Sequence, residues 1–166
     1  MQAPGSPNRT ESTENFPTAS LLLARPVRAQ VLAFYRFVRL ADDIADSAEL
    51  PPEEKLRRLD ALEAALDDPA TTQQEAAAMH ARAVGVAEAR RMLSAFRQDA
   101  TQARHADWAE LADYCTRSAD PVGRMLLRLH GDLSDEAAHA ADGLCSALQV
   151  LNHIQDAQDD RATLGH

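Results

Sequence analysis

Hydrophobic residues recur every three or four positions along most of this 166-residue chain, a spacing that favours amphipathic helices over strands. Upstream of residue 50, Pro26 suits the first turn of a helix over about 26–47, because that turn leaves its amide groups without intrahelical partners. The stretch 49–69 then combines a loop containing two adjacent prolines with a helix whose leucines share one face. These leucines are Leu56, Leu59, Leu62 and Leu66.

Helix-breaking residues interrupt the same hydrophobic periodicity later in the chain. Residues 73–102 predict one broken helix or two consecutive helices, with Gly85 as the weak point. A helix over about 108–129 is interrupted near Pro121, because proline removes an amide donor and crowds the preceding turn. A last helix is expected over about 134–162.

The amino-terminal residues have a different composition. Residues 1–14 are rich in Pro, Ser, Thr and Asn, which predicts a mobile tail ahead of one domain over 15–166. A short helix is expected to start at Thr18 or Ser20 and to end before Pro26. Ala and Leu dominate while Val and Ile are few, and no convincing strand appears. The predicted fold class is therefore all-α, either a bundle or an orthogonal helical array.

Charge and cysteine content narrow the function classes. The formal net charge of −9 argues against nucleic acid as a partner, because phosphate backbones bind basic surfaces. The two cysteines, Cys115 and Cys145, form no disulfide framework, which favours a reduced cytoplasmic protein. Residues 1–16 contain no apolar run that would serve as a secretion signal or anchor, and no window approaches the roughly 20 apolar residues of a membrane span.

Two of the expected helices continue an apolar face into aspartates. On the helix over 26–47, the positions that share one face are Val31, Tyr35, Val38, Asp42 and Asp46. Buried carboxylates cost several kcal/mol each unless a cation or hydrogen bonds compensate. Asp42 and Asp46 lie one turn apart, about 6 Å along the axis, so both reach one cluster of metal ions.

The last helix repeats this register beside an apolar stripe of Leu144, Leu148 and Leu151. Its polar positions are Cys145, Gln149, Asn152, Asp156 and Asp160. Carboxylate and amide oxygens select hard cations, and Mg²⁺ prefers a few carboxylates together with waters and substrate phosphate oxygens. Two such turns that face each other would hold a diphosphate through bridging Mg²⁺ ions.

Several of these residues have simpler interpretations. Acidic helix ends are usually solvated, which we expect for Asp43 and Asp159. Arg39 is placed either to pair with an aspartate one turn later or to contact a phosphate group. The histidines have no metal-ligand spacing and are expected to be structural or solvated, and Trp108 and Phe96 are expected in the core or at its boundary.

Three segments, YRFVRLADDIAD (35–46), YCTRSADPVGRMLLRLHG (114–131) and ALQVLNHIQDAQDD (147–160), resemble those of the squalene/phytoene synthase family. The resemblance covers residues 14–164 and implies an isoprenoid-synthase helical fold, with two facing Asp-rich helices around a central cavity. Finer features, ENFPTASLLLA, SADPVG and NHIQD, look like those of the hopanoid-pathway hydroxysqualene synthases.

The resemblance also implies roles for individual residues. It implies that Mg²⁺ is bound by Asp42, Asp46, Asn152, Asp156 and Asp160. It implies contacts to the diphosphate from Tyr35 and Arg39, and from Ser20 in an amino-terminal flap, while Gln149 matches a substrate-contacting amide. Tyr114, as an expected catalytic residue, and Gly123 match positions that line the hydrocarbon channel near the reacting carbons.

Two departures from the family pattern concern substrate contact. Gln155 occupies a substrate-binding position where many relatives carry Arg, so an amide replaces one positive partner of the diphosphate. Asp120, within SADPV, stands where condensing relatives are small and apolar. We expect Asp120 either to assist catalysis by positioning water or merely to cap the half-helix after Pro121.

The reaction implied by the resemblance is the Mg²⁺-dependent conversion of presqualene diphosphate and water to hydroxysqualene and diphosphate. The alternatives are head-to-head condensation of prenyl diphosphates to presqualene diphosphate or phytoene, and a non-catalytic helical fragment that pairs with another chain. Because family members continue with several more helices after the second acidic turn, the chain is expected to be a carboxy-terminally truncated copy. The lipophilic substrate favours peripheral contact with the inner face of the membrane.

Overall fold

A computed structural model describes residues 23–102, 104–131 and 134–164, with side chains as far as residue 155. All regular elements in these ranges are helices, as predicted. Their bounds are α2 (Arg25–Asp46), α3 (Pro52–Asp67), α4 (Gln74–His80), α5 (Val86–Asp99), α6 (Trp108–Ser118), α7 (Asp120–Leu129) and α8 (Asp135–Leu164). The expected tail and the short helix near Ser20 lie outside the described residues.

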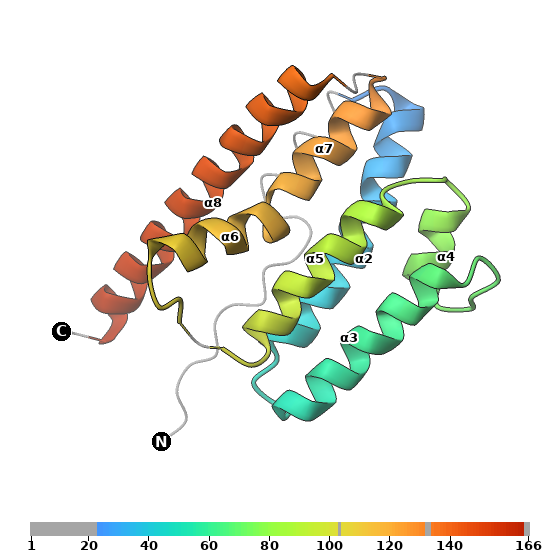
Figure 1. Ribbon diagram of the computed structural model, residues 1–166. Helices are drawn as coiled ribbons and strands as arrows, with labels where there is room; N and C mark the ends of the chain where they lie inside the picture. Colours follow the sequence, from blue (N-terminus) through green and yellow to red (C-terminus); the bar gives the residue numbers. More distant parts are fainter. Residues whose placement is uncertain (1–22, 103, 132–133, 165–166) are drawn as a thin grey trace.

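The helices are arranged around α5, which packs against α2, α3, α6 and α7 (Figure 1). The short helix α4 lies against α2 and α3, and α8 runs along the outside of α6 and α7. The larger core lies among the first four described helices and includes Phe37, Leu59, Met79 and Leu93, with Met125 added from α7. The predicted leucine face of α3 is confirmed, because Leu59, Leu62 and Leu66 are buried and Leu56 packs against them.

Both predicted helix breaks are present. Gly85 separates α4 from α5 with φ = +62°, and a Cβ atom at this position would lie 2.4 Å from Cδ2 of Phe34. Glycine is therefore required both by the left-handed backbone and by the close approach of a buried ring. The second break falls at Ala119, which ends α6 and precedes α7 just before Pro121.

Side-chain caps precede several helices, α6 and α8 among them. The carboxylate of Asp107 accepts a hydrogen bond from the amide of Glu110 at 2.9 Å and opens α6. The hydroxyl of Ser134 accepts one from the amide of Ala137 at 3.3 Å ahead of α8, at the start expected from the sequence. These caps satisfy amide groups that the first turn of a helix leaves unbonded.

Some apolar side chains lie in solvent. Trp108 is 67% exposed, so its expected place in the core or at its boundary is wrong. The buried residues of α6 are Tyr114, Cys115 and Ser118, all beyond its first turn. On α8 the apolar stripe is also exposed, with Leu144 at 63% and Leu148 at 52%. In the described residues, no helix is both long and apolar enough to cross a membrane.

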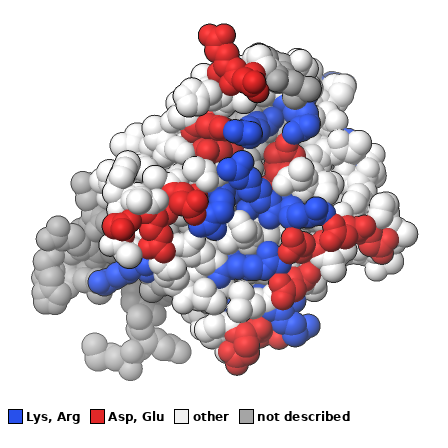
Figure 2. Space-filling model, viewed as in Figure 1, with Lys and Arg blue, Asp and Glu red and all other residues white. Residues whose placement is uncertain are grey.

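On the face shown in Figure 2, Lys and Arg side chains gather in the middle, with Asp and Glu side chains among and around them. Arg97 on α5 pairs with Asp60 and Glu63 of α3, and Arg124 on α7 pairs with Asp142 of α8. In both pairings, acidic groups of a neighbouring helix neutralise the guanidinium charge locally.

Candidate functional site

A cleft of about 260 Å³ opens between α2, α5, α6 and α8. Its lining residues are Tyr35, Val38, Arg39, Asp42, Met92, Phe96, Tyr114, Ser118 and Gln149. Of the residues expected from the sequence to contact metal or substrate, five therefore line one cleft although they come from three helices. The remaining wall is apolar, with Val38, Met92 and Phe96 excluding water from one side.

The first acidic turn closes one end of the cleft. Arg39 donates from Nη1 to Oδ2 of Asp42 at 3.0 Å and from Nη2 to Oδ1 of Asp43 at 2.9 Å. The predicted pairing across one helical turn is thus present with both aspartates. Asp46 follows one turn later and is exposed, with the ammonium group of Lys55 nearby on the carbonyl of Ala45.

The carboxyl groups of this turn are hard to ionise. Burial raises the pKa of Asp42 to about 7, and the negative charge of Asp46 adds to the effect while Arg39 opposes it. Partial desolvation also raises the pKa of Asp46 although this residue is exposed, and the charges of Lys55 and Arg39 act in the opposite direction. A divalent cation would relieve this cost, because it favours the charged form of both groups.

The sequence analysis missed a third acid, Asp99 at the end of α5. Its Oδ2 accepts a hydrogen bond from the Tyr114 hydroxyl at 2.9 Å. Burial raises the pKa of Asp99, the Tyr114 bond lowers it, and the charge of Asp46 raises it. A signal for Asp99 exists in the sequence, because Met92, Phe96 and Asp99 are spaced by four and three residues, the register of the two acidic turns.

Tyr114 lines the cleft and is hydrogen-bonded to Asp99. Burial, together with the Asp99 carboxylate, raises the pKa of its phenol, so the hydroxyl stays protonated and donates to Asp99. Its ring packs against His105, with centroids 4.8 Å apart, and against His153, with centroids 5.6 Å apart. Two histidines with no predicted site role therefore hold the ring of the expected catalytic tyrosine.

The second acidic turn is described only in part. Gln149 lines the cleft, whereas Asn152 and Gln155 are exposed. The side chains of Asp156 and Asp160, and the whole of Ser20, lie outside the described residues. Within the described part of the chain, no three Asp, Glu, His or Cys side chains converge closely enough to form a metal site by themselves.

The other two expected site residues lie between α7 and α8. Asp120 is buried and its Oδ1 accepts a hydrogen bond from the Ser146 hydroxyl at 2.8 Å. It makes no side-chain cap to α7, so the capping alternative is wrong, and it is absent from the residues that line the cleft. Gly123 is buried where a Cβ atom would lie 2.8 Å from Sγ of Cys145. The catalytic role of Asp120 and the channel role of Gly123 stay predictions.

The donor set fits Mg²⁺ in chemistry. Asp42 and Asp46 present oxygen ligands one helical turn apart, and desolvation raises the pKa of both carboxyl groups, a cost that a divalent cation would offset. Mg²⁺ binds with one or two protein carboxylates when waters and phosphate oxygens complete its shell. The described residues therefore supply the protein share of such a site, with Asp99 close enough to interact electrostatically with Asp42.

Comparisons with known proteins place the chain in one family. The family model for squalene/phytoene synthase matches residues 9–166. A hydroxysqualene synthase from Sinorhizobium fredii is 48% identical over 151 residues, covering 89% of this chain and 51% of that protein. Another from Rhodopseudomonas palustris is 45% identical over 160 residues, covering 94% of this chain and 54% of that protein.

A solved structure is also similar. The squalene synthase HpnC from Alicyclobacillus acidocaldarius superposes with a TM-score of 0.78 at 34% identity, covering 90% of this chain and 58% of that chain. The chain thus spans about half the length of the curated relatives it matches. The all-helical architecture predicted from the sequence is that of this solved relative.

Proposed function

This chain belongs to the squalene/phytoene synthase family, and on that basis we propose that it acts in the conversion of presqualene diphosphate and water to hydroxysqualene and diphosphate. Support for this branch comes from the two relatives of 48% and 45% identity, both hydroxysqualene synthases. The observation that carries the proposal is the cleft in which the first acidic turn, an apolar wall and the Tyr114–Asp99 pair meet.

Leaving-group activation is assigned to the acidic turns. Asp42 and Asp46, joined by Asn152, Asp156 and Asp160 of the family motif, would hold Mg²⁺. When bound, Mg²⁺ supplies Lewis-acid stabilisation of the charge that develops on the departing diphosphate. Tyr35 and Arg39 orient that diphosphate from the same helix, and Arg39 is already held at the cleft by Asp42.

Capture of the carbocation by water needs a proton acceptor. The water oxygen forms the new C–O bond with its lone pair, and one of its protons must leave. Tyr114 takes up that proton while passing its own to Oδ2 of Asp99, to which it already donates at 2.9 Å. The raised pKa of Asp99 suits it to accept a proton. Val38, Met92 and Phe96 keep other water from the cation.

Product analysis tests this function. Incubation with presqualene diphosphate and Mg²⁺ should give hydroxysqualene, Asp42→Asn should reduce the rate by roughly 100-fold, and Tyr114→Phe by about 100-fold or more. Asp113→Asn, an exposed acid on the same helix as Tyr114, is the matched control and should retain full activity. Formation of phytoene or squalene from prenyl diphosphates would instead assign the chain to another branch.

Membrane contact is proposed to be peripheral, on the cytoplasmic side, because both substrate and product are lipophilic. We expect the protein to float with lipid vesicles and to be released from them without detergent, since peripheral contact involves no membrane-spanning segment. Extraction that requires detergent would contradict this assignment.

A further inference from the structure

Ser118 is the last residue of α6 and lines the same cleft as Tyr114. The two residues are four positions apart on one helix, so their side chains share a face and lie one turn apart. Ser118 is only 8% exposed. The cleft therefore contains a buried hydroxyl group to which neither the sequence analysis nor the mechanism above gives a role.

The hydroxyl oxygen of Ser118 is shielded from solvent and makes no hydrogen bond of ordinary geometry with any of the described residues. Serine and threonine within helices commonly donate to a carbonyl three or four residues earlier, as Thr116 does to Asp113 at 2.8 Å. Burial of a hydroxyl without such a bond costs stability. A buried group of this kind requires an explanation, and an enclosed water molecule is one.

The Ser118 hydroxyl lies near that of Tyr114. Burial and the Asp99 carboxylate raise the pKa of the Tyr114 phenol, and the Ser118 hydroxyl acts in the opposite direction. Because Tyr114 donates its own proton to Oδ2 of Asp99 at 2.9 Å, its oxygen keeps the capacity to accept from another donor. A water molecule held inside a protein needs about two polar partners or more, and these two hydroxyl oxygens supply them.

The break between α6 and α7 decides which polar residue of this segment reaches the cleft. Helix α6 ends at Ser118, and α7 begins two residues later at Asp120. Asp120 accepts a hydrogen bond from Ser146 of α8 at 2.8 Å and is absent from the residues that line the cleft. Ser118 is therefore the residue of SADPV that can contact a water molecule in the cleft.

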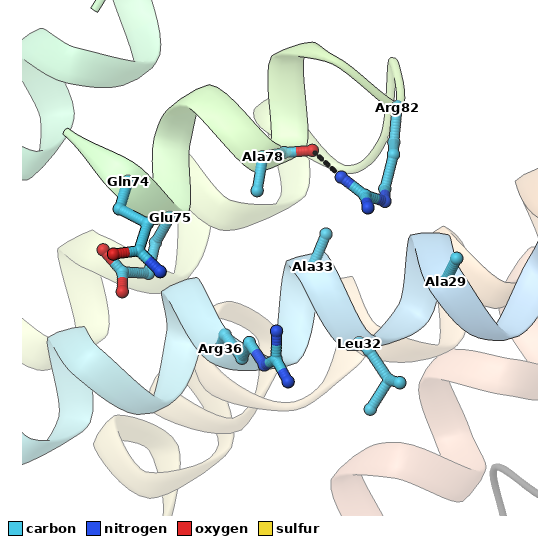
Figure 3. Close-up of a pocket in the computed structure, with 8 residues that line it drawn as sticks. All are labelled: Ala29, Leu32, Ala33, Arg36, Gln74, Glu75, Ala78 and Arg82. Atoms are coloured by element: carbon cyan, nitrogen blue, oxygen red, sulfur yellow. Dashed lines mark hydrogen bonds between the residues drawn. The ribbon is translucent and has the colours of Figure 1, made fainter. Parts of the chain in front are cut away.

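A second hollow, between α2 and α4, is lined by polar groups of a different kind (Figure 3). Arg82 donates from Nη1 to the carbonyl of Ala78 at 3.2 Å. The Oε2 atom of Glu75 accepts a hydrogen bond from the side-chain amide of Gln73 at 2.5 Å. Because these groups already have partners within the protein, the Ser118 hydroxyl marks the cleft as the place where a small polar ligand gains a hydrogen bond.

We propose that Ser118 holds the water molecule that captures the carbocation, with Oγ of Ser118 and the hydroxyl oxygen of Tyr114 as its two hydrogen-bonding partners. This inference rests on the proposed function. Serine has one side-chain torsion with three staggered positions, so Oγ turns toward the water without any movement of α6. The apolar side chains of Val38, Met92 and Phe96 offer the water no competing partner on their side of the cleft.

Ser118 neither gains nor loses a proton in this step. The lone pair of the water oxygen forms the new C–O bond, one proton passes to Tyr114, and the proton of Tyr114 passes to Oδ2 of Asp99. The second proton of the water stays on its oxygen as the hydroxyl proton of the product and donates to Oγ of Ser118. Ser118 thus fixes the position from which the water attacks, and with it the carbon that receives the hydroxyl group.

Product analysis of Ser118→Ala with presqualene diphosphate and Mg²⁺ tests the inference. We expect the share of hydroxysqualene among the products to fall about three- to tenfold, in favour of elimination products and isomeric alcohols, because one hydrogen bond to the water is lost. The rate of diphosphate release should change less than this share, since departure of the diphosphate precedes capture by water. Ser118→Thr keeps a hydroxyl group at this position and should restore most of the share.

Thr116→Val is the matched control. It removes a hydroxyl group of the same helix that bonds to a backbone carbonyl and does not line the cleft, so it should change neither the product share nor the rate. Thermal melts distinguish the proposed role from a structural one. Because Oγ of Ser118 makes no ordinary hydrogen bond within the described residues, Ser118→Ala should melt at or above the temperature of the parent.

Two results would overturn the inference alone: a parent that makes hydroxysqualene together with a Ser118→Ala variant of unchanged product share, or a Ser118→Ala variant that melts below the parent. A parent that makes no hydroxysqualene would overturn the proposed function and this inference with it.

Discussion

Asp42 is a single residue at which folding and ligand binding make opposite demands. Folding places its carboxyl group in surroundings that favour the neutral form, whereas Mg²⁺ requires the charged form. Arg39 compensates part of the charge but also neutralises Asp43. Under the proposed function, a bound cation would offset the cost of the charged carboxylate that the metal-free protein carries at this position.

The pH dependence of stability should reveal this conflict. The folded state raises the pKa of Asp42 from 3.8 to about 7, so the folded protein binds a proton that the unfolded chain releases between those values. Stability is then lost as the pH rises through this window. Asp42→Asn removes the loss, and we expect it to be more stable than the parent by about 1–2 kcal/mol at pH 8, after discounting for solvent screening.

Thermal melts at pH 5 and pH 8 check this expectation. The advantage of Asp42→Asn should shrink towards pH 5, and addition of Mg²⁺ at pH 8 should raise the melting temperature of the parent but not of the variant. An equal difference at both pH values would show that Asp42 ionises normally.

Gly85 makes a second prediction at this scale. Gly85→Ala puts a Cβ atom within 2.4 Å of the buried Phe34 ring and forces alanine to adopt φ = +62°. We expect it to destabilise the fold by about 2–4 kcal/mol, from backbone strain plus overpacking. Gly143→Ala is the control, because nothing lies within 4 Å of its added Cβ atom and alanine favours the helix. Denaturant unfolding should order the variants as Gly143→Ala, parent, Gly85→Ala.

Single residues were predictable from the sequence where their role depends on spacing along one helix. Asp42 and Asp46 follow from the register of α2, as does the Arg39 pairing. Asp99 was missed because its partner Tyr114 lies 15 residues away and reaches it only through the turn between α5 and α6. Of the two alternatives for Asp120, the capping one was wrong, because the side-chain partner of Asp120 is Ser146 on another helix.

At the scale of elements, the contact between α7 and α8 sets how close the second acidic helix lies to the cleft. Gly123 allows the approach, Asp120 bonds to Ser146, and Arg124 pairs with Asp142. These contacts involve the two turns of α8 that precede Gln149. They therefore fix the position of α8 where Gln149 lines the cleft. The local propensities that predicted both helices carry no information about this contact.

Gly123→Ala should separate these helices. The added Cβ atom would lie 2.8 Å from Sγ of Cys145 and 3.2 Å from Cβ of Ala141, and we expect a loss of about 1–2 kcal/mol despite better helix propensity. Cys145→Ala removes the nearer of these atoms and should restore most of the loss in the double variant. Additive effects in this double-mutant cycle, measured by urea unfolding, would refute direct contact.

At the scale of the whole molecule, the all-α class predicted from composition and periodicity is confirmed, because every regular element in the described residues is a helix. The relative placement of helices was available only through the family resemblance, since a helix does not encode which neighbour it packs against. The leucines that form the predicted apolar stripe of α8 are half or more exposed in the described chain.

This exposure predicts that the apolar stripe of α8 binds hydrophobic dyes and promotes self-association. Leu144, Leu148 and Leu151 are 63%, 52% and 54% exposed and share one face of α8. Leu148→Gln should lower the fluorescence of bound anilinonaphthalene sulfonate and reduce concentration-dependent association in sedimentation runs. Ala147→Gln, the exposed neighbour, serves as control and should change neither. Unaltered dye binding in Leu148→Gln would show that this stripe is not the surface that binds the dye.

Trp108 has a consequence for how this protein can be followed in solution. It is the single tryptophan of the chain, it lies at the start of α6, and it is 67% exposed in the folded state. Its emission spectrum will therefore shift little during denaturation, and acrylamide will quench it in the native state. Ellipticity measured by circular dichroism is the better reporter of unfolding. A blue shift of the indole emission would instead indicate that another molecule has bound over the first turn of α6.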